Sequence, residues 1–397
     1  MSLSPWFCEV TLWTCMALLL FAYVGYPLVI WCCSRLFGRV KVIPAAQERY
    51  LPSLSLLIVA HNEEAAIEER LENALMTDYP AEQMEIMVAS DGSSDATPSI
   101  VRGYQHRGVR LLEYTERRGK AAVINRAIRE LSGEVVLLSD ANTSIDVTAA
   151  RNITRWFHDP AVGVVCGQLL LTSTDVGSNA DDLYWRYENF LKKSEGRLGA
   201  LLGANGAIYA LRRHLFVPVP ENTIVDDFVI PLAAKLRSGC EIVYDPESLA
   251  REEIARDLGD EFRRRARLGA GGYQSLRLLW RLLDPRRGWI AFSYFAHKVL
   301  RWFGPFFLTT ALACNACLLH RPFYLYLFFA QLAFYFLSIV AIMNPVPAKP
   351  LRFLLLAPMF TGMNAALLVG FWRWLMGTQC GAWKRTARPA ELSGNPR

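Results

Sequence analysis

Asp140 and Asn142 lie two residues apart, directly after the apolar run 134–139. This spacing lets two oxygen-bearing side chains face one hard cation, with substrate phosphates completing the coordination shell. The pair therefore predicts a site for Mg²⁺ or Mn²⁺, and the residue types do not choose between the two metals. A helix N-cap or an ordinary loop is the alternative, since Asp and Asn are common at caps.

The elements that must position this pair are strands and helices in alternation. The apolar runs 54–60, 85–90, 109–114 and 134–139 are each followed by a polar cluster and a stretch with helical spacing. This order predicts an α/β fold with a mostly parallel sheet and helices on both faces. The clusters at the strand ends then share the edge where such sheets bind ligands; they are His61 to Glu64, Asp91 to Asp95, and Asp140 with Asn142.

Three cationic residues, Arg117, Arg118 and Lys120, stand at the start of the predicted helix over 117–128. Cations and free backbone N–H groups at a helix start suit a phosphate, although a solvated basic helix start is the alternative. The chain has neither a G-x-x-x-x-G-K-[ST] motif nor a strand followed by G-x-G-x-x-G, so P-loop and Rossmann sites lose their main support.

The 397 residues are 52% hydrophobic, which is high for a protein without membrane segments. Four apolar runs predict transmembrane helices, at 12–33, 303–319, 323–343 and 353–372. No cationic residue precedes the first run and no small-residue cleavage site follows it, which disfavours a signal peptide. The positive charges that follow that run, at Arg35, Arg39 and Lys41, predict that the middle of the chain is cytosolic. The protein is expected to lie in the cell inner membrane.

The predicted organisation therefore has five parts. They are an N-terminal transmembrane helix (1–34), a cytosolic domain (35–285), an interfacial amphipathic helix (286–302), three C-terminal transmembrane helices (303–376) and a polar tail (377–397). Lys384, Arg385 and Arg388 in the tail conflict with the external position that three C-terminal spans would give it. The net charge of +6 favours membrane lipids or an anionic substrate as partners, and no nucleic-acid-binding module is present.

Seven segments in order resemble the signature series of family 2 inverting glycosyltransferases. They are LLIVAHNEE, VASDGSSD, RRGKAAVINRAI, LLSDAN, GANGAIYALRR, TIVDDFVIPLAAKLRSG and RRRARLGAGGYQ. The likeness covers roughly residues 52–305 and is greatest to the membrane-bound chitin, hyaluronan, poly-N-acetylglucosamine and cellulose synthases. It implies the GT-A fold and a UDP-sugar donor.

The resemblance also implies roles for residues that bind the nucleotide sugar. Those residues are His61, Glu63, Asp91, Lys120 and Asp140, with Asp91 holding the uracil and Asp140 and Asn142 occupying the metal-binding D-x-D position. Asn142 replaces the last aspartate of that motif, so the metal site loses one negative charge. His61 stands where the family more often has an aromatic residue.

Asn205, Gly206 and Asp226 match the family's acceptor-binding positions, and Asp227 matches its catalytic aspartate. Arg264 and Arg267 match the Q-x-x-R-W motif that grips the leaving diphosphate. In that motif Arg264 replaces Gln and Leu268 replaces Trp, which removes a ring for sugar stacking.

An acceptor hydroxyl needs a base within hydrogen-bond reach, and Asp227 is the candidate. A neighbouring Asp226 and burial would raise its affinity for a proton. Asp226 and Asp227 also fit a plain helix N-terminus, since a helical pattern follows them. The cluster around Arg264 and Arg267 fits a lipid-facing basic surface as well.

The sequence therefore predicts a membrane-bound inverting glycosyltransferase acting on a lipid-linked or polysaccharide acceptor in exopolysaccharide or glycolipid assembly. Its sugar is expected to be N-acetylglucosamine or glucose. The first alternative is transfer of one sugar to polyprenyl phosphate or another lipid. A non-catalytic membrane scaffold or transport subunit and a nucleotidyltransferase are the further alternatives.

Overall fold

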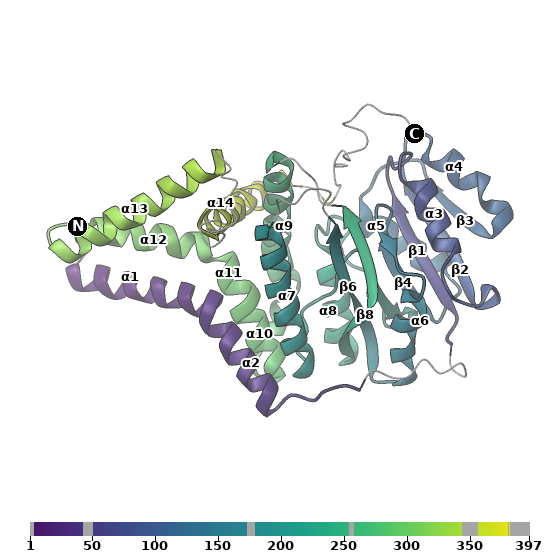
Figure 1. Ribbon diagram of the computed structural model, residues 1–397, viewed down its shortest axis with the longest axis horizontal. Helices are drawn as coiled ribbons and strands as arrows, with labels where there is room; N and C mark the ends of the chain where they lie inside the picture. Colours follow the sequence, from purple (N-terminus) through teal and green to yellow (C-terminus); the bar gives the residue numbers. More distant parts are fainter. Residues whose placement is uncertain are drawn as a thin grey trace.

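The computed structural model describes residues 4–42, 51–172, 179–253, 258–343, 356–379 and 381. An α/β domain forms one end of the molecule and long apolar helices form the other, with helices α7 and α9 between them (Figure 1). The last positions of the predicted tail, including Lys384, Arg385 and Arg388, lie outside the described residues.

A single eight-stranded sheet, in the order β3-β2-β1-β4-β7-β6-β8-β5, forms the α/β domain. Strands β3, β2, β1 and β4 are parallel neighbours, as the sequence predicts. Strand β7 runs antiparallel to both β4 and β6, while β6 and β8 are parallel. The strands are β1 Leu54–Ala60, β2 Met84–Asp91, β3 Val109–Tyr114, β4 Val135–Asp140, β5 Ser144–Ile145, β6 Val162–Thr172, β7 Tyr209–Arg212 and β8 Glu241–Glu253.

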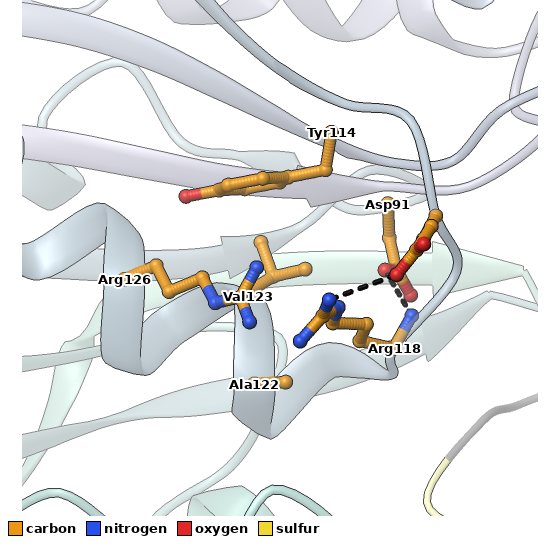
Figure 2. A pocket seen from close by; sticks show the side chains of 7 residues that line it. Asp91, Tyr114, Arg118, Ala122, Val123 and Arg126 are labelled. Atoms are coloured by element: carbon orange, nitrogen blue, oxygen red, sulfur yellow. Dashed lines mark hydrogen bonds and ion pairs between the residues drawn. The ribbon is translucent and has the colours of Figure 1, made fainter.

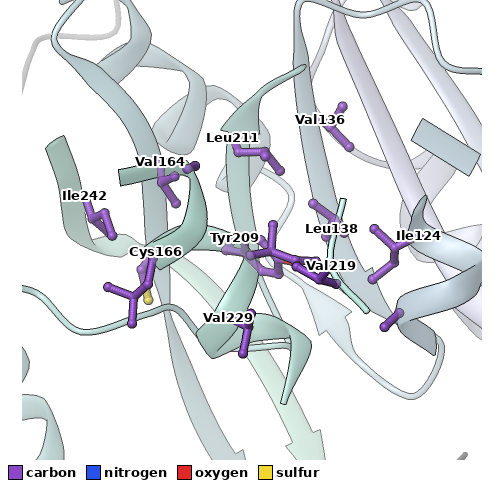
Figure 3. Close-up of a cluster of buried hydrophobic side chains, with 14 of the residues drawn as sticks. Ile124, Val136, Leu138, Val164, Cys166, Tyr209, Leu211, Val219, Val229 and Ile242 are labelled. Atoms are coloured by element: carbon purple, nitrogen blue, oxygen red, sulfur yellow. The ribbon is translucent and has the colours of Figure 1, made fainter. Parts of the chain in front are cut away.

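Hydrophobic cores lie on both faces of this sheet. Along β1, Leu56 and Ile58 enter one core while Leu57 and Val59 enter the other, as the two-residue period of a strand requires. Figure 3 shows part of the second core, where Ile124 of α5 and Val229 of α8 lie near the strand residues. Every residue of β1 is buried, which matches its continuous apolar run.

Helices cover each face because their apolar residues recur at helical spacing. In α3, Ile67, Leu71 and Ala74 are spaced by four and three residues, and all three are buried in the first core. The helices of the domain are α3 Ile67–Leu75, α4 Thr97–Gly103, α5 Lys120–Ala127, α6 Ala149–Thr154, α7 Asn179–Arg197, α8 Asp226–Ser238 and α9 Leu258–Leu278.

Within the part of the chain that the structure describes, two helices are long and apolar enough to cross a membrane, namely the continuous helix Pro5–Leu36 and Pro322–Ala341 within α13. The first consists of α1 Pro5–Leu20, a π-helical turn Phe21–Gly25 and α2 Tyr26–Leu36. The other apolar helices are α12 Gly304–Ala316, α13 Pro322–Met343 and α14 Leu356–Leu375. The 13 residues of α12 extend only about 20 Å at the usual helical rise, which is shorter than a hydrocarbon core.

Helix α14 lies across the other apolar helices and packs on α9 of the α/β domain. Figure 1 looks nearly along α14, whereas α1, α12 and α13 lie in the plane of the view. The contact is close because it involves glycines: a Cβ on Gly370 would lie 2.5 Å from the Ala266 carbonyl oxygen, and one on Gly269 would lie 3.2 Å from Leu367 Cα. The prediction of four membrane-crossing helices therefore stays a prediction.

The segment predicted as an interfacial helix is largely enclosed by protein. It forms α10 Trp289–Ser293, a π-helix Tyr294–Val299 and α11 Leu300–Trp302, and His297 within it is 1% exposed. Two of its residues contact acids of α7: Arg301 donates to Glu188 Oε1 at 2.8 Å, and His297 Nδ1 lies 2.6 Å from Glu195 Oε1. The Arg301 pair directs that charge toward the protein, whereas Arg286 and Arg287 at the start of the segment are exposed.

Candidate active site

Asp91 ends strand β2 and is fully buried. Its two carboxylate oxygens accept hydrogen bonds from the backbone N–H groups of Arg118 at 2.8 Å and Gly119 at 2.9 Å. Gly119 has φ 95°, a conformation that favours glycine and aims these N–H groups at the strand end. The sequence had suggested a phosphate at this helix start, but the two N–H groups bind Asp91 instead.

The loop after β1 supports the same strand end. His61 Nδ1 donates to the Asp91 carbonyl oxygen at 2.7 Å, and the Glu63 N–H donates to Thr97 Oγ1 at 2.8 Å. Both His61 and Glu63 are 8% exposed. His61 and Glu63, which are predicted to lie beside the nucleotide, therefore also have a structural role: they join the loops that follow β1 and β2.

A shallow hollow adjoins Asp91. Figure 2 shows the Tyr114 ring on one side of it and Ala122, Val123 and Arg126 of α5 on the other. The Arg126 guanidinium lies 5.7 Å from the centre of the Tyr114 ring. A flat ring and a carboxylate can bind a planar base that carries N–H donors, but here Asp91 is fully buried and Arg126 lies over the ring, so a base would have to displace the arginine.

Gly206 marks the point where the predicted catalytic groups converge. A Cβ at this glycine would lie 3.2 Å from Asp140 Oδ2, 3.5 Å from Asp227 Oδ2 and 3.6 Å from Lys120 Nζ. The Gly206 N–H donates to Asp227 Oδ2 at 3.0 Å, which fixes the carboxylate beside the loop. Residues from four separate segments thus meet at one place at the carboxyl end of β4.

Lys120 is the cation at the centre of this cluster. Its Nζ donates to Asp140 Oδ1 at 2.6 Å and lies 3.4 Å from Asp226 Oδ2. Burial alone would lower its pKa, but the charges of Asp140 and Asp226 raise the pKa of Lys120 above its ordinary value. The ammonium group therefore stays charged and partly offsets three carboxylates.

Asp226 and Asp227 are the first residues of α8, so their predicted place at a helix N-terminus and their place in the site coincide. Burial, then the negative charge of Asp226, raises the pKa of Asp227 to about 6, against the opposing effect of Lys120. Asp226 is 6% exposed, and its Oδ2 has the ion pair with Lys120 at 3.4 Å but no hydrogen bond. With a pKa of about 6, the Asp227 carboxylate can accept a proton near neutral pH.

The side chains around Asp140 fit a hard divalent cation. Their available ligand atoms are oxygens, and the negative charges of the carboxylates exceed the single positive charge of Lys120. Asn142 lies beside Asp140 and donates through Nδ2 to Glu252 Oε1 at 3.0 Å. Burial, then the charge of Asp140, raises the pKa of Glu252. Asp140 and Asn142 could hold the cation, and Glu252 adds a third acidic or amide side chain at the same edge.

The two arginines of α9 differ in their surroundings. Arg264 is exposed and pairs with Glu261 at 2.8 Å, three residues earlier on the helix. Arg267 is partly buried; burial lowers its pKa, and the charges of Asp226, Asp227 and Asp140 oppose that shift. Arg267 therefore shares the field of the acidic cluster, whereas Arg264 lies at its margin. Leu268 is 39% exposed.

Asn205 of the predicted acceptor loop is buried and held from two sides. Its Nδ2 donates to the Gly167 carbonyl oxygen at 2.9 Å, and Lys192 of α7 donates to its Oδ1. These contacts fix the loop that ends in Gly206.

Three residues of the site were not found from the sequence. Glu252 is more than a hundred positions from Asn142, and Arg70 of α3 donates from Nε to the Asp140 carbonyl oxygen at 3.4 Å. Tyr209 is fully buried with an unpartnered hydroxyl; burial, then the charge of Asp226, raises its pKa well above the ordinary value. Only Tyr209 had a signal, because it lies within the quoted segment GANGAIY.

Known proteins resemble this chain in sequence and in fold. A poly-beta-1,6-N-acetyl-D-glucosamine synthase of Staphylococcus aureus is 28% identical over 233 residues, covering 57% of this chain and 56% of that protein. The enzyme of the same name from Staphylococcus epidermidis is 25% identical over 259 residues, covering 63% of this chain and 62% of that protein. The aligned segments thus span somewhat more than half the length of these curated relatives.

A solved mannosyltransferase of Pyrobaculum calidifontis, in complex with GDP-Man and Mn²⁺, superimposes with a TM-score of 0.69 at 25% identity. The match covers 92% of this chain and 99% of that one, so the likeness extends beyond the α/β domain. Residues 55–216 match the family model described as Glycosyl transferase family 2. Residues 55–216 therefore form a domain of the family 2 glycosyltransferase type, and the chain has the GT-A fold.

Proposed function

We propose that this protein is a membrane-bound inverting glycosyltransferase that moves a sugar from a UDP-sugar to a membrane-associated acceptor in exopolysaccharide assembly. The observation that carries the proposal is the convergence of Asp140, Asp227 and Lys120 around Gly206. The poly-N-acetylglucosamine synthases among its relatives favour N-acetylglucosamine as the sugar. The hollow beside Asp91 and Tyr114 supports a base-binding site close to that cluster.

The reaction is a single displacement. Asp227 takes the proton of the acceptor hydroxyl as its oxygen forms a bond to the anomeric carbon. The bond from that carbon to the diphosphate oxygen breaks on the opposite side, and the nucleoside diphosphate leaves with the electron pair. One such step inverts the anomeric centre, and no covalent enzyme intermediate is formed.

Charge at the diphosphate must be balanced as it leaves. We assign Lys120 and Arg267 this role, since both lie in the field of the acidic cluster. Asp140 and Asn142 would hold Mg²⁺ or Mn²⁺, which supplies Lewis-acid stabilisation of the leaving diphosphate when it is bound. Asn205, Gly206 and Asp226 would shape the acceptor side of the site.

We further propose a multi-pass protein of the inner membrane with its α/β domain in the cytosol. Gly381, just after α14, lies against the backbone of Asn222 and Thr223, since a Cβ there would be 3.1 Å from the Thr223 carbonyl oxygen. This contact supports a C-terminal end on the same side as the active site. If α14 lies parallel to the membrane surface instead of crossing the membrane, the cationic tail is in the cytosol, as the positive-inside rule favours.

Transfer of one sugar to a lipid phosphate is the second candidate. One observation favours it: Leu268 supplies no ring where the synthases have Trp. Both candidates use the same site chemistry and differ in the acceptor.

The test uses membranes that contain the full chain, incubated with a panel of radiolabelled UDP-sugars and GDP-mannose with Mg²⁺ or Mn²⁺. The main proposal expects labelled polymer from UDP-N-acetylglucosamine. A single labelled sugar in the organic phase supports the lipid acceptor instead. Release of pyrophosphate rather than nucleoside diphosphate, or no turnover of any donor, would refute both.

A further inference from the structure

Glu252 lies at the end of strand β8, where the short strand β5 brings it to the loop of Asp140 and Asn142. Strands β5 and β8 pair antiparallel, with Ser144 opposite Arg251 and Ile145 opposite Ala250. Extending this register by one residue sets Glu252 beside the chain that precedes Ser144. The fold thereby brings a carboxylate to the predicted cation site from a distant part of the sequence.

The hydrogen bond between Asn142 and Glu252 settles which end of the amide remains available. A carboxylate only accepts hydrogen bonds, so it takes the Nδ2 side of Asn142, at 3.0 Å from Glu252 Oε1. The carbonyl oxygen Oδ1 is then the group left for a cation. Ligand atoms held in this way bind metal more tightly than freely rotating ones.

Charge gives an independent argument. Asn142 stands where an aspartate would carry one more negative charge, and Glu252 supplies one negative charge against the same residue. The group formed by Asp140, Asn142 and Glu252 therefore has two carboxylates, as a pair of aspartates would have. Lys120 is the cation that already neutralises Asp140, so the second carboxylate matters for a divalent ion.

We propose that Glu252 is a positioning residue for the divalent cation, because it orients the Asn142 amide and restores the missing negative charge. The inference rests on the proposed function, since it takes Asp140 and Asn142 as cation ligands. A purely structural role for Glu252 at the strand end would instead leave cation affinity unchanged.

The test measures Mn²⁺ binding directly, by electron paramagnetic resonance of free Mn²⁺, with the purified full chain in detergent and saturating UDP. Glu252→Gln should raise the Kd for Mn²⁺ about tenfold, in the range seen when second-layer partners of metal ligands are removed. Glu247→Gln is the matched control, because Glu247 lies on the same strand and its side chain is paired with Arg155 at 2.8 Å. It should leave the Kd within twofold of the unmodified protein.

A double variant that moves the negative charge from residue 252 to residue 142 distinguishes an effect on the cation from a general loss of structure. Asn142→Asp combined with Glu252→Gln should bring the Kd back to within about threefold of the original, since the number of carboxylates is restored. If Glu252→Gln alone does not fold, Asn142→Asp alone should tighten Mn²⁺ binding.

Three results would overturn the inference: an unchanged Kd in Glu252→Gln, a double variant as weak as Glu252→Gln, or no UDP-dependent Mn²⁺ binding by the unmodified chain. None of these measurements requires sugar transfer. A chain that binds Mn²⁺ as expected but transfers no sugar would therefore count against the proposed function and not against Glu252.

Discussion

The two carboxylates that the site depends on most, Asp91 and Asp227, lie in opposite electrostatic surroundings. Asp91 receives two backbone N–H groups, both within 2.9 Å, at the end of a parallel strand. Asp227 receives one backbone N–H and faces Asp226 and Asp140. Hydrogen bonds hold the first carboxylate in place, while burial and like charges destabilise the charge of the second.

This difference separates recognition from chemistry. A carboxylate held by two backbone hydrogen bonds keeps a fixed position and suits the binding of a base. A carboxylate whose charge is opposed by its neighbours gains affinity for a proton and suits general-base catalysis. The parallel strands β1 to β3 thus provide a fixed binding surface. Where β4, α8 and the Gly206 loop meet, repulsion between carboxylates raises the proton affinity of Asp227, which the reaction needs.

The largest effect is expected from Asp227→Asn, which removes the base and keeps the shape. Turnover should fall about a thousandfold, within the usual range for loss of a general base, while UDP binding stays within about twofold. Radiometric transfer assays and equilibrium UDP binding measure the two effects. Asp146→Asn, a change at a partly buried residue just after β5, should retain activity. Turnover near the original level in Asp227→Asn would exclude Asp227 as the base.

The reciprocal change is Asp91→Ala. It leaves the N–H groups of Arg118 and Gly119 without their acceptor, which lowers the free energy of unfolding by about 1–3 kcal/mol. Because the proposed contact with the base is lost as well, UDP binding should weaken by roughly tenfold to a hundredfold. Isothermal titration with UDP measures this loss. If Asp91 served only the fold, thermal stability would fall while the affinity of the remaining folded protein stayed the same.

The pH profile sharpens the comparison. Asp227 acts as a base only when it has lost its proton, so kcat/KM should rise with pH through an apparent pKa near 6. Asp226→Asn removes the neighbouring negative charge, lowers the pKa of Asp227, and should move this acidic limb to lower pH. Initial rates between pH 5 and pH 8 measure the shift; a limb that stays in place would mean that another group titrates.

The smallest effect is expected from Gly370→Ala on α14. The added Cβ would lie 2.5 Å from the Ala266 carbonyl oxygen on α9, so α9 must shift at a cost of about 1–3 kcal/mol. Because Arg267 lies on α9, transfer should slow several-fold while UDP binding stays the same. Gly362→Ala on the same helix is the control, since its Cβ would have no neighbour within 4 Å. Equal thermal stability and activity in both variants would show that the close packing is not needed.

The parallel half of the sheet could be predicted because its signals are local. Each apolar run of β1, β2 and β4 ends in its own polar cluster, so chain order and strand direction together place Asp91 and Asp140 at one edge. Family resemblance added Asp227 and Gly206, whose meeting with Asp140 depends on contacts between distant segments.

Contacts between distant segments account for what the sequence did not reveal. The partner of Asn142 depends on the register of β5 against β8, and the N–H groups before α5 are taken by Asp91 rather than left for a phosphate. The position of α14 follows from glycine packing against α9, whereas its composition alone is equally typical of a membrane-crossing helix.

The first apolar helix has a practical consequence for anyone preparing this protein. The Tyr26 hydroxyl donates to Glu195 Oε1 at 2.7 Å, and Tyr26 and Ile30 pack with Leu191 in one buried cluster. Removing residues 1–42 to obtain a soluble fragment would expose Leu191 to water and leave Glu195 with one fewer donor. Expression trials should therefore retain the leading helix and use detergent or nanodiscs, because that helix is part of the folded unit.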